Sequence, residues 1–208
     1  AHPAELPELV RQHKASISRE IVRQLKAHLR RSEPRFSEPK VLPFDSIKPW
    51  RYAAAEQSRR DFRVMAKPVG DYLFGGFAKA CHLEYKFDSS PEKDFAVALE
   101  NDPEVVKWLR PAKDQFAIWY DESTRRYEPD FVVETTALIY LVEVKRRDQL
   151  AHPDVLAKGA AAKEFCKHAT NFNLTQGKKA WAYAILAHDE VSTSYTMAHM
   201  LKSAAVSA

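Results

Sequence analysis

The sequence predicts a mixed α/β fold in which one helix, three meandering strands, a second helix and a further strand follow one another. Three runs of apolar and aromatic residues have the length of strands and are separated by polar turn residues. These runs occupy residues 115–121, 126–134 and 139–146. A segment rich in Ala and Lys, both good helix formers, follows at 155–170. A short apolar run, typical of a buried strand, stands at 181–188.

The residues before this core favour a long helix followed by an irregular stretch. Over residues 5–31, apolar side chains recur at steps of three and four and form one stripe. The opposite face is basic, which most simply indicates a solvated surface and alternatively a contact with a phosphate backbone. Four prolines between residues 34 and 49 exclude a continuous helix there. We therefore expect a helical and extended N-terminal region over residues 1–70 and the main domain over residues 71–208.

Several further elements are expected around the three strands. Residues 73–88 contain aromatic residues and two adjacent glycines, which favours a strand or a hairpin. A helix is predicted over residues 90–100, with Ser90 as its N-cap and Pro91 at its first position. A second short helix is expected at 102–109, and a terminal helix is expected from about residue 192 to residue 203.

Composition narrows the class of protein. The 208 residues suit one domain with an extension, and 45% apolar residues are enough for a core. The net charge of +4 permits nucleic-acid binding without proving it. Cys81 and Cys166 form no CxxC pair, so we expect a reduced cytoplasmic protein without a structural zinc site. No apolar run reaches membrane-spanning length and no phosphate-binding loop is present, so neither a membrane partner nor nucleotide hydrolysis is expected.

Two short motifs concentrate charge inside the predicted strands. Asp130 follows Pro129 in the second strand, and Glu143 and Lys145 stand two positions apart in the apolar third strand. Side chains alternate across a strand, so Glu143 and Lys145 point to the same face. If the two strands pair as a hairpin, Asp130 lies close to Glu143. Charges buried in this way are expensive unless they are paired or bind a metal.

This combination suits metal-assisted hydrolysis of a phosphodiester bond. Two adjacent carboxylates are hard oxygen ligands, which favour Mg²⁺ or Mn²⁺ over zinc. A lysine beside them can orient or deprotonate a water molecule, or offset the charge that grows in the transition state. Each motif alone has a simpler explanation, because an E-x-K strand often forms an ordinary ion pair. Their order and spacing favour catalytic roles for Asp130, Glu143 and Lys145.

Other charged residues extend this hypothesis. Glu92 shares a helical stripe with apolar residues, so it is a candidate catalytic residue and metal ligand, although a favourable interaction with the helix dipole explains it equally well. Asp94 lies off that stripe and is the weaker alternative. Four basic residues are candidates for contacts with nucleic-acid phosphates, with solvated surface as the simpler interpretation for the helical ones: Arg146, Arg147, Lys158 and Lys163.

One part of the chain resembles a known group of nucleases. YEPDF at 127–131 and LVEVK at 141–145, followed by the Lys- and Ala-rich helix, resemble the PD-(D/E)XK superfamily. More narrowly, residues 89–201 resemble the C-terminal endonuclease domain of type III restriction enzyme Res subunits. The resemblance implies a restriction-endonuclease-like αβββαβ core, Mg²⁺ or alternatively Mn²⁺ as cofactor, and double-stranded DNA as substrate. It also implies metal ligation by Asp130, Glu143 and Glu92, with Lys145 as the catalytic lysine.

The same resemblance implies partners. Relatives of this kind work in restriction or helicase–nuclease systems, beside a helicase motor and a methyltransferase-type recognition subunit. Neither is encoded in these residues, so the chain would be either a nuclease piece of a larger prokaryotic-type protein or a stand-alone relative. A catalytically inactive nucleic-acid-binding or scaffolding module with the same fold is the main alternative. RNA as the substrate is a third.

Overall fold

The structure is a computed structural model that describes four ranges: residues 6–28, 46–49, 58–120 and 125–207. The chain divides into two compact units, Ala1–Glu38 and Pro39–Ala208. In the first unit, α1 (Leu6–His28) confirms the predicted N-terminal helix, and its apolar stripe is exposed. Non-helical backbone angles at His13 mark a kink in this helix. Most of the predicted proline-rich stretch lies outside the described residues.

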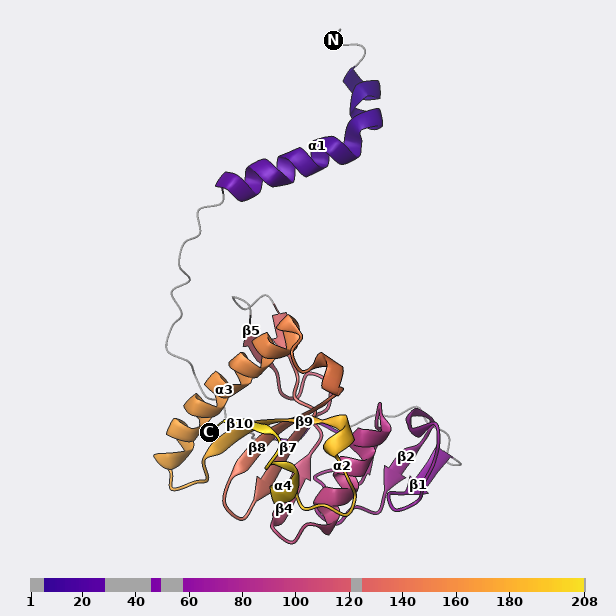
Figure 1. Cartoon of the computed structure of the whole chain (residues 1–208), viewed down its shortest axis with the longest axis vertical. Helices are drawn as coiled ribbons and strands as arrows, with labels where there is room; N and C mark the ends of the chain where they lie inside the picture. Colours follow the sequence, from indigo (N-terminus) through magenta and orange to yellow (C-terminus); the bar gives the residue numbers. More distant parts are fainter. Residues whose placement is uncertain (1–5, 29–45, 50–57, 121–124, 208) are drawn as a thin grey trace. The chain divides into compact units, whose positions relative to one another are not determined.

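A five-stranded mixed sheet forms the centre of the second unit. In chain order its strands are β4 (Val105–Leu109), β7 (Phe131–Thr135), β8 (Ile139–Lys145), β9 (Trp181–Ala187) and β10 (Ala205–Ser207). Their spatial order is β10-β9-β8-β7-β4 (Figure 1). The strands β4, β7 and β8 form an antiparallel meander. β9 runs parallel to β8, whereas β10 is antiparallel to β9.

Helices cover both faces of this sheet. α2 (Ser90–Asn101) packs through Phe95 in the apolar cluster that also contains Val142 of β8. α3 (Pro153–Leu174) packs on the opposite face, in the cluster that contains Leu141 (Figure 1). Neighbouring residues of a strand point to opposite faces, so β8 contributes alternately to the two clusters. The crossover through α3 also explains why β9 runs parallel to β8, since parallel neighbours need a long connection.

Two smaller β-structures accompany the main sheet. β1 (Arg59–Asp61), β2 (Leu73–Gly75) and β3 (Glu84–Tyr85) form a three-stranded sheet whose aromatic residues join the α2-side cluster. β2 and β3 are antiparallel, which confirms the hairpin predicted within 73–88. β5 (Ile118–Tyr120) and β6 (Arg125–Tyr127) form a two-stranded ladder, here called the β5–β6 ladder. The ladder contributes three residues to the α3-side cluster: Ile118, Tyr120 and Tyr127.

The segment after α2 differs from the prediction. Residues 102–109, expected to be a helix, contain strand β4, so that expectation is wrong. Val105 and Trp108 of β4 are buried, and the strand pairs with β7. Branched and aromatic residues fit a pleated, half-buried surface. Tertiary pairing therefore outweighs the helix-opening signal of the Asp-Pro dipeptide at the start of this segment.

The antiparallel meander also contains other segments of the chain than the sequence predicts. The strand expected at 115–121 is shorter and belongs to the β5–β6 ladder, and β4 takes its place in the main sheet. The strand expected at 126–134 divides into β6 and β7 around Glu128-Pro129-Asp130. Proline has no N–H to donate to a ladder, which explains a break at this point.

Other boundaries shift without changing the architecture. Ser89, and not Ser90, caps α2, because its Oγ accepts a hydrogen bond from the Glu92 N–H. The expected terminal helix is reduced to α4 (Met197–Met200), followed by β10. The units divide earlier than the expected boundary at residue 70, and β1 pairs with β2 across that point. The remaining short elements are 3-10 turns: η3 (Val69–Asp71), η4 (Arg147–Gln149) and η5 (His188–Glu190).

Candidate active site

The register of β7 and β8 brings the two motifs together. The last paired residues are Phe131 and Val142, so Asp130 stands one residue further along, opposite Glu143. The Asp130 Oδ2 atom accepts a hydrogen bond of 3.0 Å from the Val144 N–H. The predicted pairing of the two strands is therefore confirmed, and it places Asp130 beside the strand that carries Glu143.

Glu143 and Lys145 lie on the same face of β8, as the alternation of side chains predicts. The Lys145 Nζ atom is 2.5 Å from the Glu143 Oε1 atom. Glu143 is buried, whereas the side chain of Lys145 is 28% exposed. Val142 and Val144 belong to the apolar cluster on the other face. A partly buried ion pair thus stands at the end of a strand whose remaining residues are apolar.

Tyr127 is a member of the site that sequence reasoning missed. It ends β6, and its hydroxyl donates a hydrogen bond of 2.8 Å to the Glu143 Oε2 atom. Both oxygens of Glu143 therefore have partners, Lys145 on one and Tyr127 on the other. The only signal in the sequence was that a tyrosine stands three residues before Asp130. That spacing does not show that the Tyr127 hydroxyl reaches Glu143 in β8.

The charged groups alter one another's protonation. Removal from solvent and the Glu143 carboxylate raise the pKa of Asp130 to about 7, although Lys145 opposes this rise. Burial alone would lower the pKa of Lys145, but the carboxylates of Glu143 and Asp130 outweigh it and the pKa is raised. Lys145 is therefore held as an ammonium ion. The two crowded carboxylates would be stabilised further by a second cation.

Glu92 lies near this pair but has a different partner. The Glu92 Oε2 atom is 3.0 Å from the Arg110 Nη2 atom and also accepts a hydrogen bond of 3.1 Å from the Asp88 N–H. Burial raises the pKa of Glu92, Arg110 opposes the rise, and the charge of Asp130 adds to it. Within the described residues, no three His, Cys, Asp or Glu side chains gather closely enough to hold a metal ion. Asp130 and Glu143 thus form a pair of potential ligands, while Glu92 is paired with Arg110.

A cavity of about 650 Å³ opens beside Lys145. Its lining comes from the start of α2, the end of β8 and the residues that follow: Ser89, Pro91, Val144, Lys145, Arg146, Arg147, Asp148 and His188. Arg146 is paired with Asp148 at 2.8 Å, and Arg147 is paired with Asp189 at 2.7 Å and with Glu190 at 2.6 Å. Both arginines are more than half exposed. The predicted phosphate contacts Arg146 and Arg147 thus lie at the rim of this cavity.

The predicted lysines of α3 lie elsewhere. Lys158 is paired with Asp154 at 2.8 Å, and Lys163 is exposed. Neither lysine lines the cavity beside Lys145. Their assignment to nucleic-acid phosphates therefore has no support from the geometry of the candidate site.

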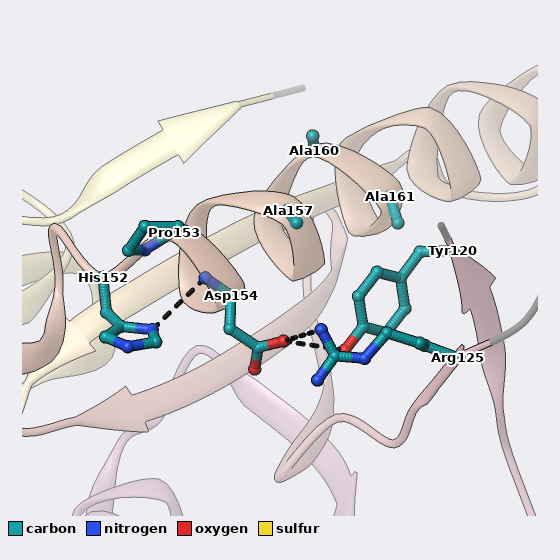
Figure 2. A pocket seen from close by; sticks show the side chains of 8 residues that line it. All are labelled: Tyr120, Arg125, His152, Pro153, Asp154, Ala157, Ala160 and Ala161. Carbon is teal, nitrogen blue, oxygen red and sulfur yellow. Dashed lines mark hydrogen bonds and ion pairs between the residues drawn. The ribbon is translucent and has the colours of Figure 1, made fainter. Parts of the chain in front are cut away.

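A larger cavity of about 860 Å³ lies beside the first half of α3 (Figure 2). It is lined by Tyr120, Arg125, His152, Pro153, Asp154, Ala157, Ala160 and Ala161. Asp154 is paired with Arg125 at 2.8 Å and accepts a hydrogen bond of 3.1 Å from the Tyr120 hydroxyl. The Nδ1 atom of His152 accepts a hydrogen bond of 3.2 Å from the Asp154 N–H. These groups satisfy one another, and none of the predicted catalytic residues lines this cavity.

Comparison of the chain with models of protein families, with curated proteins and with solved structures finds no match. Among the described residues, no helix combines the length and the apolar character needed to cross a membrane. The function is therefore inferred from the geometry of the site and from the arrangement of the elements around it.

Proposed function

We propose that the second unit is a magnesium-dependent nuclease that hydrolyses phosphodiester bonds in DNA. The observation that carries this proposal is the convergence of Asp130, Glu143 and Lys145 at the end of β8. Three charged groups stand together where the surrounding strand residues are apolar. Such an arrangement is costly for stability alone, and perturbed ionisable groups of this kind gather at functional sites.

The residues present fit a hard divalent cation. Asp130 and Glu143 offer carboxylate oxygens, and Mg²⁺ is commonly held by one or two carboxylates together with water and substrate phosphate oxygens. The raised pKa of Asp130 reflects burial and the negative charge of Glu143, which a divalent cation would offset. A bound divalent cation supplies Lewis-acid activation of a phosphate oxygen and lowers the pKa of a bound water. Glu92 does not join this ligand set, since Arg110 neutralises it.

Lys145 provides the remaining chemistry. Hydrolysis adds water across a P–O bond, so negative charge develops on the phosphate oxygens as the bond to the leaving oxygen breaks. The ammonium of Lys145 lines the cavity and stands 2.5 Å from Glu143, where it can approach that charge. Because neighbouring carboxylates raise its pKa, charge stabilisation suits Lys145 better than removal of a proton from water.

DNA as the substrate is supported by the cavity and by the order of the elements. Arg146 and Arg147 stand at the rim beside Lys145, and exposed arginines suit contacts with phosphates. The series α2, β4, β7, β8, α3 and β9 follows the αβββαβ order of the restriction-endonuclease-like core that the resemblance implies. We therefore favour a PD-(D/E)XK endonuclease that works in a restriction or helicase–nuclease system.

Cleavage of plasmid DNA by the whole chain tests the proposal. We expect nicked or linear DNA with Mg²⁺ or Mn²⁺ and none with EDTA. Lys145→Ala should lower the rate at least ~100-fold, the order of magnitude for removing a charge-stabilising donor. Lys178→Ala, which removes an exposed lysine after α3, is the matched control and should cleave normally. Cleavage that survives both EDTA and Lys145→Ala would refute the mechanism.

The main alternative is separated in the same assay. A nucleic-acid-binding module without catalysis would bind DNA in a gel-shift experiment. It would not cleave the DNA, whichever divalent metal is added. Single-stranded RNA of the same length serves as the competing substrate, and faster cleavage of RNA than of DNA would reassign the substrate class.

A further inference from the structure

Tyr127 contacts Glu143 from outside the main sheet. It is the last residue of β6, whereas Glu143 stands in β8, sixteen residues further along the chain. The Tyr127 ring is buried in the α3-side cluster with Leu141 and Tyr183. Its hydroxyl donates a hydrogen bond of 2.8 Å to the Glu143 Oε2 atom. The ladder therefore carries one hydroxyl group to one oxygen of the candidate metal-binding carboxylate.

The two partners of Glu143 differ in how easily they can leave. Tyr127 is 3% exposed and packs in the α3-side cluster, whereas the side chain of Lys145 is 28% exposed and lines the cavity. Burial therefore favours retention of the contact between Oε2 and Tyr127, whereas the partly exposed Lys145 can leave Oε1 more easily.

We infer that Tyr127 is a positioning residue that fixes the rotamer of Glu143 and presents its Oε1 atom to a divalent cation. The inference rests on the proposed function and adds a specific consequence to it. Oε1 would then serve as the ligand atom for the cation, Tyr127 would keep the carboxylate in place, and Lys145, which lines the cavity, would be free to face a phosphate there. Hydrogen bonds from such supporting residues orient metal ligands and commonly change metal affinity by ~10–100-fold.

Tyr127→Phe tests this inference, because it removes only the hydroxyl and keeps the ring in the apolar cluster. The dissociation constants for Mn²⁺ and Mg²⁺ are measured by calorimetry on the whole chain without DNA. We expect both to rise ~10–100-fold in Tyr127→Phe. With DNA present, the metal concentration that gives half-saturation should rise by the same factor. The cleavage rate at saturating metal should stay within about threefold of that of the unsubstituted chain, since the cation then holds Glu143 in place.

Tyr120→Phe is the matched control. Tyr120 lies in the partner strand of the same ladder, and its hydroxyl donates to Asp154 rather than to a candidate ligand. This variant should bind metal as the unsubstituted chain does. Circular dichroism and thermal unfolding of both variants verify that the ladder remains folded.

The remaining outcomes distinguish the inference from the proposed function. Metal affinity in Tyr127→Phe within twofold of the unsubstituted chain would overturn the inference and leave the nuclease proposal intact. A lower rate at saturating metal with unchanged affinity would also overturn it. Metal binding that weakens in Tyr127→Phe although no variant cleaves DNA would support the inference and refute the nuclease activity. Absence of divalent binding in the unsubstituted chain refutes both.

Discussion

Replacing Arg110 by methionine would leave a buried carboxylate without its charge partner. The Arg110 side chain is 10% exposed and that of Glu92 is 12% exposed, with 3.0 Å between their Nη2 and Oε2 atoms. Arg110 also donates hydrogen bonds to the Lys86 carbonyl oxygen and to the Asp88 carboxylate. Its guanidinium lies over the ring of Phe87, 5.5 Å from the centroid. Methionine keeps much of the packing of the arginine stem and removes the charge and its donors.

We expect Arg110→Met to lower the free energy of unfolding by about 3–5 kcal/mol, the usual effect of removing one partner of a buried ion pair. Adding Glu92→Gln should recover at least about 1 kcal/mol, because glutamine leaves no buried charge. The deficit should also depend on pH. Burial raises the pKa of Glu92 and Arg110 opposes that rise, so loss of Arg110 raises the pKa further. Ionisation of Glu92 then destabilises the folded variant more. Arg110→Met should therefore lower the free energy of unfolding by more at pH 8 than at pH 5.

Urea unfolding of the whole chain, followed by circular dichroism and tryptophan fluorescence at both pH values, measures these differences. Arg146→Met is the control, since Arg146 and its partner Asp148 are both exposed. This control should change the free energy of unfolding by about 0.5 kcal/mol or less. A loss below about 1 kcal/mol in Arg110→Met would refute the reasoning, as would a double variant that is no more stable than Arg110→Met.

Two further predictions concern β4 and Asp130. Trp108→Ala should cost about 3–5 kcal/mol in urea unfolding, because the ring is buried and stacks on Tyr85 at 4.8 Å; a loss under about 1 kcal/mol would mean that this residue does not pack in a core strand. In EDTA, Asp130→Asn should gain stability relative to the unsubstituted chain as pH rises from about 4 to about 7. The pKa of Asp130 is raised to about 7 in the folded chain, so ionisation over this range destabilises the folded state. A stability difference that stays constant between pH 4 and pH 8 would contradict this sign.

The parts of the fold that were predictable depend on local pattern. β8 is an apolar run in which Glu143 and Lys145 stand two positions apart, so its position and the shared face of these residues followed from the sequence. α3 followed from its helix-forming residues. β4 did not, because a proline after Asp102 opens a helix as readily as it precedes a strand. Pairing with β7, twenty or more residues along the chain, decides between the two.

The same distinction between local pattern and long-range contacts applies to the candidate site. The position of Asp130 opposite Glu143 was predictable, since it needs only a hairpin register. The partners of Glu92 and Glu143 were not, because Arg110 and Tyr127 reach them through contacts between separate elements. A periodic pattern shows that Glu92 faces inward, but it contains no information on which cation meets it there. Long-range pairing therefore decides whether an inward carboxylate can bind metal or is already neutralised.

The β5–β6 ladder is the part of the site with the lowest expected local stability. A two-stranded ladder is marginally stable alone, so its order depends on packing against α3. Glu143 stands in β8, the central strand of the five, for which we expect slow exchange of amide hydrogens for deuterium, whereas we expect the ladder that carries Tyr127 to open locally at lower cost. Local opening would then release Glu143 Oε2 while the five strands remain intact. At subsaturating metal, activity should accordingly be lost at a lower urea concentration than the circular dichroism signal of the sheet.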